Sequence, residues 1–116
     1  MLAREQAIKE NVSSEMMAWI RESAPRIVWV TVVVRSLDKR EARELRVLVK
    51  AAEKVIVPTS TEAKDLGFVP KTQRYTYNVN AEFLYAGGLK PEGSVSVVVG
   101  WPDKSRIVEF DLDAIR

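Results

Sequence analysis

Residues 27–34 read Ile-Val-Trp-Val-Thr-Val-Val-Val, and this stretch decides which kind of fold the chain can adopt. All of its residues except Trp29 are β-branched. Such side chains favour extended backbone because their χ1 angles are restricted and they pack well on a pleated surface. Apolar residues occupy both odd and even positions, so we expect both faces of this strand to be at least partly covered. The stretch therefore predicts a β-strand in the centre of a sheet.

Three later stretches also alternate with the strand period of two. They are residues 71–80, 94–101 and 106–112. In the first of them, Tyr75 and Tyr77 share one face with Val79. The last two are joined by a typical turn sequence, Pro-Asp-Lys-Ser, so we expect them to form an antiparallel hairpin.

Apolar spacings of three and four residues predict helices in the rest of the chain. In the first helix, Ile8, Val12, Met16 and Trp19 share one face, and Pro25 ends the helix. The other helices are expected over residues 38–54, 59–66 and 81–86. The pattern predicts an α+β fold, in which a four-stranded, largely antiparallel sheet has helices packed on it. Residues 113–116 resemble a first helical turn, which predicts a C-terminal helix in the natural chain.

Composition limits the classes of function. A chain of 116 residues with 47% hydrophobic residues has the size of a single domain, residues 1–116. It contains no cysteine and no histidine, which excludes disulfides, zinc–thiolate sites and Ser–His triads. Asparagine and glutamine together number five, a scarcity typical of thermophile proteins. The charged N-terminus and the lack of a long apolar run predict a soluble, cytoplasmic protein.

The positive charge is concentrated in one segment. The net charge of the chain is +2, but residues 35–54 contain seven basic and four acidic side chains. On a helical wheel the basic residues fall opposite the apolar stripe. A face of this kind can neutralise phosphates. Alternatively, it is a solvated helix face with i,i+4 ion pairs. Its members are Lys39, Arg43, Arg46, Lys50 and Lys54.

The segment from Lys71 to Tyr85 mixes aromatic, basic and amide side chains. Unpaired bases stack on aromatic rings while cations follow the backbone, which is how single-stranded nucleic acid is held. We expect stacking by Trp29, Tyr75, Tyr77 and Tyr85, and phosphate contacts by Arg43, Arg46, Lys50, Lys71 and Arg74. The alternative is that Tyr75 and Tyr77 are core residues of their strand.

The basic helix, the tyrosine-bearing strand and the four-stranded sheet, in a chain without cysteine or histidine, resemble ThermoDBP. This is the single-stranded DNA-binding protein family of Thermoproteales archaea. The resemblance implies an aromatic cleft with a basic rim and a C-terminal helical zipper that makes a homodimer. The predicted function is non-catalytic binding of single-stranded DNA, with RNA as a further ligand and without a cofactor.

Two other functions are compatible with the same residues. One is a structural or oligomerising protein of an archaeal or viral assembly. The other is a small Mg²⁺-dependent nuclease that uses Glu109, Asp111 and Asp113, because carboxylates are the ligands that Mg²⁺ prefers.

Overall fold

The computed structural model describes residues 3–11, 14–24, 26–38, 45–51, 54–84, 95–101 and 107–111. These residues form nine β-strands and no helix. The predicted α+β fold is therefore wrong, since the described part of the chain is all-β. The strands are β1 (Ala3–Asn11), β2 (Ser14–Ala24), β3 (Ile27–Ser36), β4 (Arg46–Ala51), β5 (Lys54–Ile56), β6 (Ser60–Val69), β7 (Arg74–Leu84), β8 (Val95–Gly100) and β9 (Ile107–Asp111).

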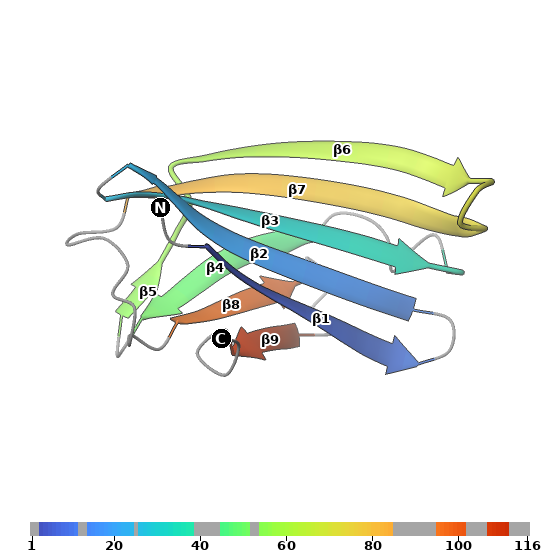
Figure 1. The fold of residues 1–116 in the computed structure, drawn as a ribbon, viewed down its shortest axis with the longest axis horizontal. Helices are drawn as coiled ribbons and strands as arrows, with labels where there is room; N and C mark the ends of the chain where they lie inside the picture. Colours follow the sequence, from blue (N-terminus) through green and yellow to red (C-terminus); the bar gives the residue numbers. More distant parts are fainter. Residues whose placement is uncertain are drawn as a thin grey trace.

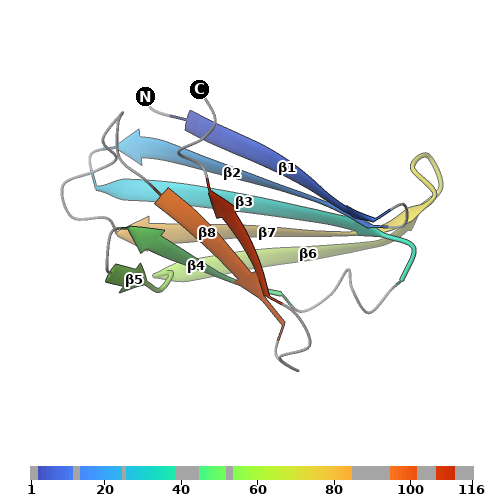
Figure 2. The same cartoon turned by 90° about the horizontal axis from the view of Figure 1, so that it is seen from below.

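The strands form two antiparallel sheets that pack face to face. One has five strands in the order β1-β2-β3-β7-β6, and the other has four in the order β5-β4-β8-β9. Figure 1 shows the long strands of the five-stranded sheet above the shorter strands of the four-stranded sheet. Figure 2, seen from below, shows the four-stranded sheet lying across the other. At one side of the sandwich β1 contacts β9.

The core lies between the sheets and is built by strict alternation along the strands. In β3 every second residue, from Val28 to Ser36, is buried, and the residues between are partly exposed. In β4 the buried side chains are Val47 and Val49, next to Leu45. Phe83 and Phe110 are the largest fully buried side chains. Because both sheets contribute valine-rich faces, the sandwich closes over a continuous apolar layer.

Several strand predictions are confirmed. Residues 27–34 lie within β3, which has β2 on one side and β7 on the other. The predicted strand at residues 71–80 corresponds to β7. The last two predicted strands are β8 and β9, and they pair antiparallel with Gly100 opposite Ile107.

The first predicted helix is wrong because a spacing of four residues is compatible with two structures. Residues four apart share a face of an α-helix, but they also share a face of a strand, whose period is two. Ile8 and Met16 are opposite each other on β1 and β2. A helix would place Trp19, three residues further on, beside Met16. In the strand β2, Trp19 instead lies on the opposite face from Met16.

The other predicted helices fail for related reasons. The described end of the segment at residues 38–54 forms β4 and β5, where Arg46 and Lys50 share the outer face of a strand. Residues 59–66 belong to β6, which is held in the sheet by its ladder to β7. The segment at 81–86 is a strand as far as Leu84, because Ala81 and Phe83 are opposite Val30 and Val28 of β3. The end of the chain, residues 113–116, lies outside the described residues.

No helix long and apolar enough to cross a membrane occurs among the residues that the structure describes.

Candidate aromatic binding surface

The residues predicted to bind nucleic acid do not share one surface. Trp29 is partly exposed on the outer face of the five-stranded sheet. Tyr75 and Tyr77 are on its inner face, opposite the buried residues Ser36 and Val34. Both tyrosines are partly buried and pack against the core. The ring of Phe68 contacts that of Tyr75 edge-to-face, with 5.4 Å between the ring centroids. The tyrosines are therefore separated from Trp29 by the sheet itself.

The predicted basic residues are also dispersed. Arg46 and Lys50 are exposed on the outer face of the four-stranded sheet, on the far side of the sandwich from Trp29. Lys71 is exposed in the turn between β6 and β7. Arg74 begins β7, where its Nη1 donates a hydrogen bond to the carbonyl of Gln73 at 3.3 Å. Arg43 and Tyr85 lie outside the described residues.

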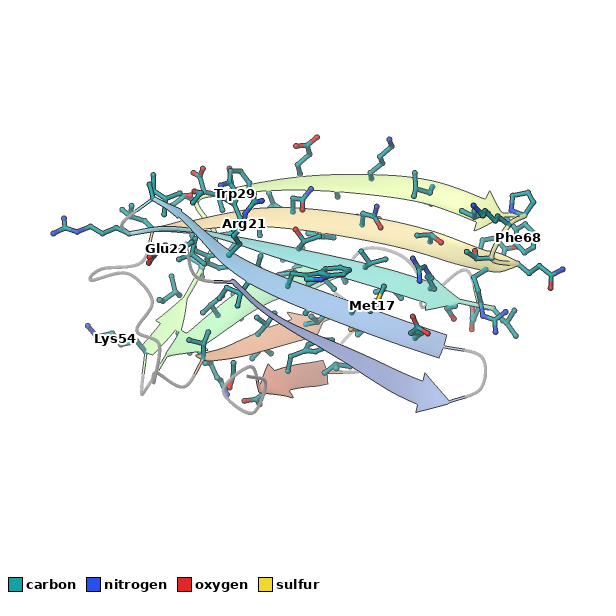
Figure 3. All side chains as sticks on the ribbon, viewed as in Figure 1. Met17, Arg21, Glu22, Trp29, Lys54 and Phe68 are labelled. Carbon is teal, nitrogen blue, oxygen red and sulfur yellow. The ribbon has the colours of Figure 1, made fainter. Side chains whose placement is uncertain are left out.

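Two tryptophans lie on adjacent strands on the outer face of the five-stranded sheet. Trp19 of β2 is opposite Thr31 of β3, and Arg21 of β2 is opposite Trp29 of β3. Trp19 and Trp29 are therefore diagonal neighbours on adjacent strands, a separation that aromatic side chains bridge. All of these side chains except Arg21, which is exposed, are partly exposed. Figure 3 shows Arg21 and Trp29 side by side, with Met17 further along β2.

We call this surface the tryptophan face. It consists of Met17, Trp19, Arg21, Trp29, Thr31 and Val33.

Beside the tryptophan face, β7 and β6 present polar side chains. Asn78, Asn80 and Glu82 of β7 are opposite Val33, Thr31 and Trp29 of β3. The hydroxyl of Thr31 donates a hydrogen bond to Oδ1 of Asn80 at 2.6 Å. This bond crosses from the apolar half of the sheet to the polar half, so the two halves form one continuous surface.

The charges on this outer face nearly cancel. Its described cations are Arg21, Arg35, Lys64 and, at the start of β7, Arg74, and its described carboxylates are Glu15, Glu62 and Glu82. Arg35 Nη1 lies 3.6 Å from Glu15 Oε1, so part of that positive charge is already matched. The surface is therefore suited to ring stacking more than to holding a polyanion by charge alone.

Sequence reasoning missed Met17, Trp19 and Arg21 as surface residues. The signal was present, because these three residues alternate with Met16, Ala18 and Ile20, which are all fully buried. Assigning residues 8–24 to a helix hid this alternation and placed Trp19 in the core.

The carboxylates suggested for a nuclease do not form a site in the described part of the chain. Glu109 is exposed on β9, and Asp111 is opposite Ser96 of β8. Asp113 lies outside the described residues. No group of three acidic residues in the described ranges could hold a metal ion.

No family model, curated protein or solved structure matches this chain. The resemblance to ThermoDBP therefore remains a prediction.

Proposed function

We propose that this chain is a non-catalytic module that binds single-stranded nucleic acid, DNA by preference, on the tryptophan face. The observation that carries the proposal is the diagonal pair Trp19 and Trp29, partly exposed on adjacent strands with Arg21 opposite one of them. The composition features noted above, above all the absence of cysteine, favour a cytoplasmic location.

Exposed sheet surfaces that carry aromatic side chains suit unpaired bases. Two neighbouring rings offer faces for two successive bases, as in RNA-binding sheets that present aromatic side chains on adjacent strands. The guanidinium of Arg21 is placed to neutralise a phosphate or to stack. The amide of Asn80, which is exposed on β7, can then bond base edges that extend past the rings. Such binding has little sequence preference, because every base has a π face.

The expected affinity is modest. Stacking contributes about 1–3 kcal/mol per base, so two bases give about 2–6 kcal/mol. The upper part of that range, about 4–6 kcal/mol, corresponds to a dissociation constant of roughly 0.04–1 mM for a short oligonucleotide. A longer strand that contacts several copies of the protein would bind more tightly.

The salt dependence of the affinity distinguishes binding on the tryptophan face from binding in the basic cleft predicted from the sequence. Each phosphate neutralised on a single strand contributes a slope of about −0.7 to log K against log salt. Arg21, Lys64 and Arg74 are the described cations of this face other than Arg35, so the slope should lie between about −0.7 and −2.1. The basic cleft predicted from the sequence would give a much steeper slope.

The test is a titration with oligo-dT that follows tryptophan emission. Stacking should quench the emission, and the variants Trp19→Leu and Trp29→Leu should each weaken binding about tenfold. Ile107→Ala is the matched control, because Ile107 is exposed on the outer face of the other sheet and should leave the affinity unchanged. The proposal fails if oligo-dT does not bind at about 1 mM protein. It also fails if a neutral oligosaccharide quenches the emission and oligo-dT does not.

A second candidate, a structural or oligomerising protein, is favoured by one observation. The strand β6 is a long sheet edge whose side chains from Ser60 to Leu66 are all exposed. That edge is open to another protein chain.

A further inference from the structure

We infer that β6 pairs antiparallel with β6 of a second copy of this chain, which joins two five-stranded sheets into one. In the strand order, β6 is the outermost strand next to β7. Among the strands that the structure describes, Figure 1 shows none beyond it. Such an edge presents unpaired N–H and C=O groups that can pair with another strand. The inference does not depend on nucleic-acid binding.

The length of the free edge is set by a β-bulge. The pairing of β6 with β7 is regular from Ser60 to Asp65 and shifts between Asp65 and Gly67. Gly67 has a φ of 63°, and its N–H donates to Oδ1 of Asp65 at 2.8 Å. Because a bulge bends the strand and interrupts the ladder, a partner strand can pair regularly only with the part before it.

Charge selects one register for two identical strands. A two-fold axis perpendicular to the sheet keeps the outer faces of the two copies on the same side. Each residue of β6 is therefore opposite a residue of the other copy whose side chain is on the same face of the strand. An axis at Glu62 would place Glu62 against Glu62, and an axis at Lys64 would place Lys64 against Lys64. An axis at Ala63 instead places Glu62 of each copy opposite Lys64 of the other. Opposite charges directly across strands stabilise a pair, and like charges destabilise it.

This register is symmetric over the regular part of the edge. Thr61 of one copy would be opposite Asp65 of the other, and Ala63 opposite Ala63. A contact in which each residue meets its counterpart reciprocally is what a closed dimer requires. The two tryptophan faces would then lie on the same side of one continuous sheet.

Charged side chains on an edge strand are also a known device against pairing. The two roles give opposite results when the charges are exchanged. If the charges only prevent association, the wild-type chain is a monomer. If they select a partner, reversing one sign breaks the dimer and reversing both restores it.

The test is sedimentation of the wild-type chain and of charge-reversed variants. The wild type should dimerise, and Glu62→Lys or Lys64→Glu should weaken the dimer about tenfold or more, because two attractive pairs become two repulsive pairs. The double variant E62K/K64E should restore the dimer. An equimolar mixture of the two single variants should form a heterodimer, because each like-charge pair is replaced by an opposite-charge pair. Both positions are exposed, so circular dichroism should show an unchanged fold.

Two results overturn the inference. The first is a wild-type chain that remains monomeric at about 1 mM. The second is a dimer that the single variants do not weaken, or one that the double variant and the mixture do not restore, because that dimer would use another surface.

Cysteine cross-linking tests the register separately. The chain has no cysteine of its own. In the proposed dimer two Ala63→Cys residues would be directly opposite, with Cα atoms about 4.5–5.5 Å apart, a distance at which disulfides form. Two Thr61→Cys residues would be four positions out of register, about 13 Å apart, and should not cross-link. Cross-linking at residue 61 and none at residue 63 would contradict the register.

Discussion

Replacing Phe83 and, separately, its neighbour Leu84 with alanine tests the central assignment of the fold. Phe83 is 0% exposed in the core, whereas Leu84 is 64% exposed at the end of the same strand. The two residues are adjacent in sequence but are on opposite faces of β7. In the helix predicted from sequence over residues 81–86, Phe83 and Ala81 would instead point to opposite sides.

The expected loss of free energy of unfolding for Phe83→Ala follows from the complete burial of this side chain. A phenylalanine side chain buries roughly 150 Å², and at about 25 cal/mol per Å² its loss removes about 4 kcal/mol. Measured Phe→Ala substitutions in cores lower stability by about 3–5 kcal/mol, in agreement. A domain of this length has a free energy of unfolding of roughly 6–17 kcal/mol, so Phe83→Ala removes a large part of it. Leu84→Ala should change the stability by less than about 0.5 kcal/mol.

Urea unfolding, followed by far-ultraviolet circular dichroism, measures both variants. The slope of the free energy of unfolding against urea concentration should be the same for both variants and the wild type. The urea concentrations at the midpoints can then be compared directly. Similar losses at Phe83 and Leu84, or a larger loss at Leu84, would refute the alternation of β7 and with it the packing of the two sheets.

Two further predictions concern the bulge and the surface. Gly67→Ala should lower the free energy of unfolding by about 1–2 kcal/mol, because Gly67 has a φ of 63° that a Cβ disfavours although its surroundings are open. Gly100→Ala, where the space is also open and φ is not positive, is its control and should be neutral or slightly stabilising in thermal unfolding. Removing the ion pair of Glu15 and Arg35 by Glu15→Gln should cost less than about 0.5 kcal/mol, since both side chains are 39% exposed. A larger loss in the same urea assay would show that this pair is coupled to other groups.

Sequence patterns predicted the strands whose alternation has only one interpretation. Residues 27–34 contain so many β-branched side chains that no helix competes, and β3 is at the centre of its sheet. The end of the chain alternates cleanly around a turn, and β8 pairs with β9. The failures occur where apolar residues recur every four positions, as with Ile8, Val12 and Met16, because that spacing fits both periods. Only the pairing with another strand, which the spacing itself does not reveal, decides between them.

The candidate site was less predictable than the fold. Trp29, predicted as a stacking platform, is partly exposed on the tryptophan face, but its neighbours Trp19 and Arg21 come from the segment assigned to a helix. The tyrosines were grouped with it because they are close to basic residues in sequence. In a sandwich, successive residues point to opposite faces, so closeness in sequence does not place side chains on one surface.

The connection between β3 and β7 has a consequence for how fast this chain folds. These strands are central neighbours, yet the chain between Ser36 and Arg74 first builds β4 and β5 in the opposite sheet and then β6. Their ladder cannot form until a long loop closes, and the entropy of that closure is lost before any contact compensates for it. Topologies dominated by such distant pairings fold in about milliseconds to seconds. During that time the valine-rich β3 has β2 beside it but lacks β7 on its other edge, which makes the nascent chain most vulnerable to aggregation at its most apolar segment.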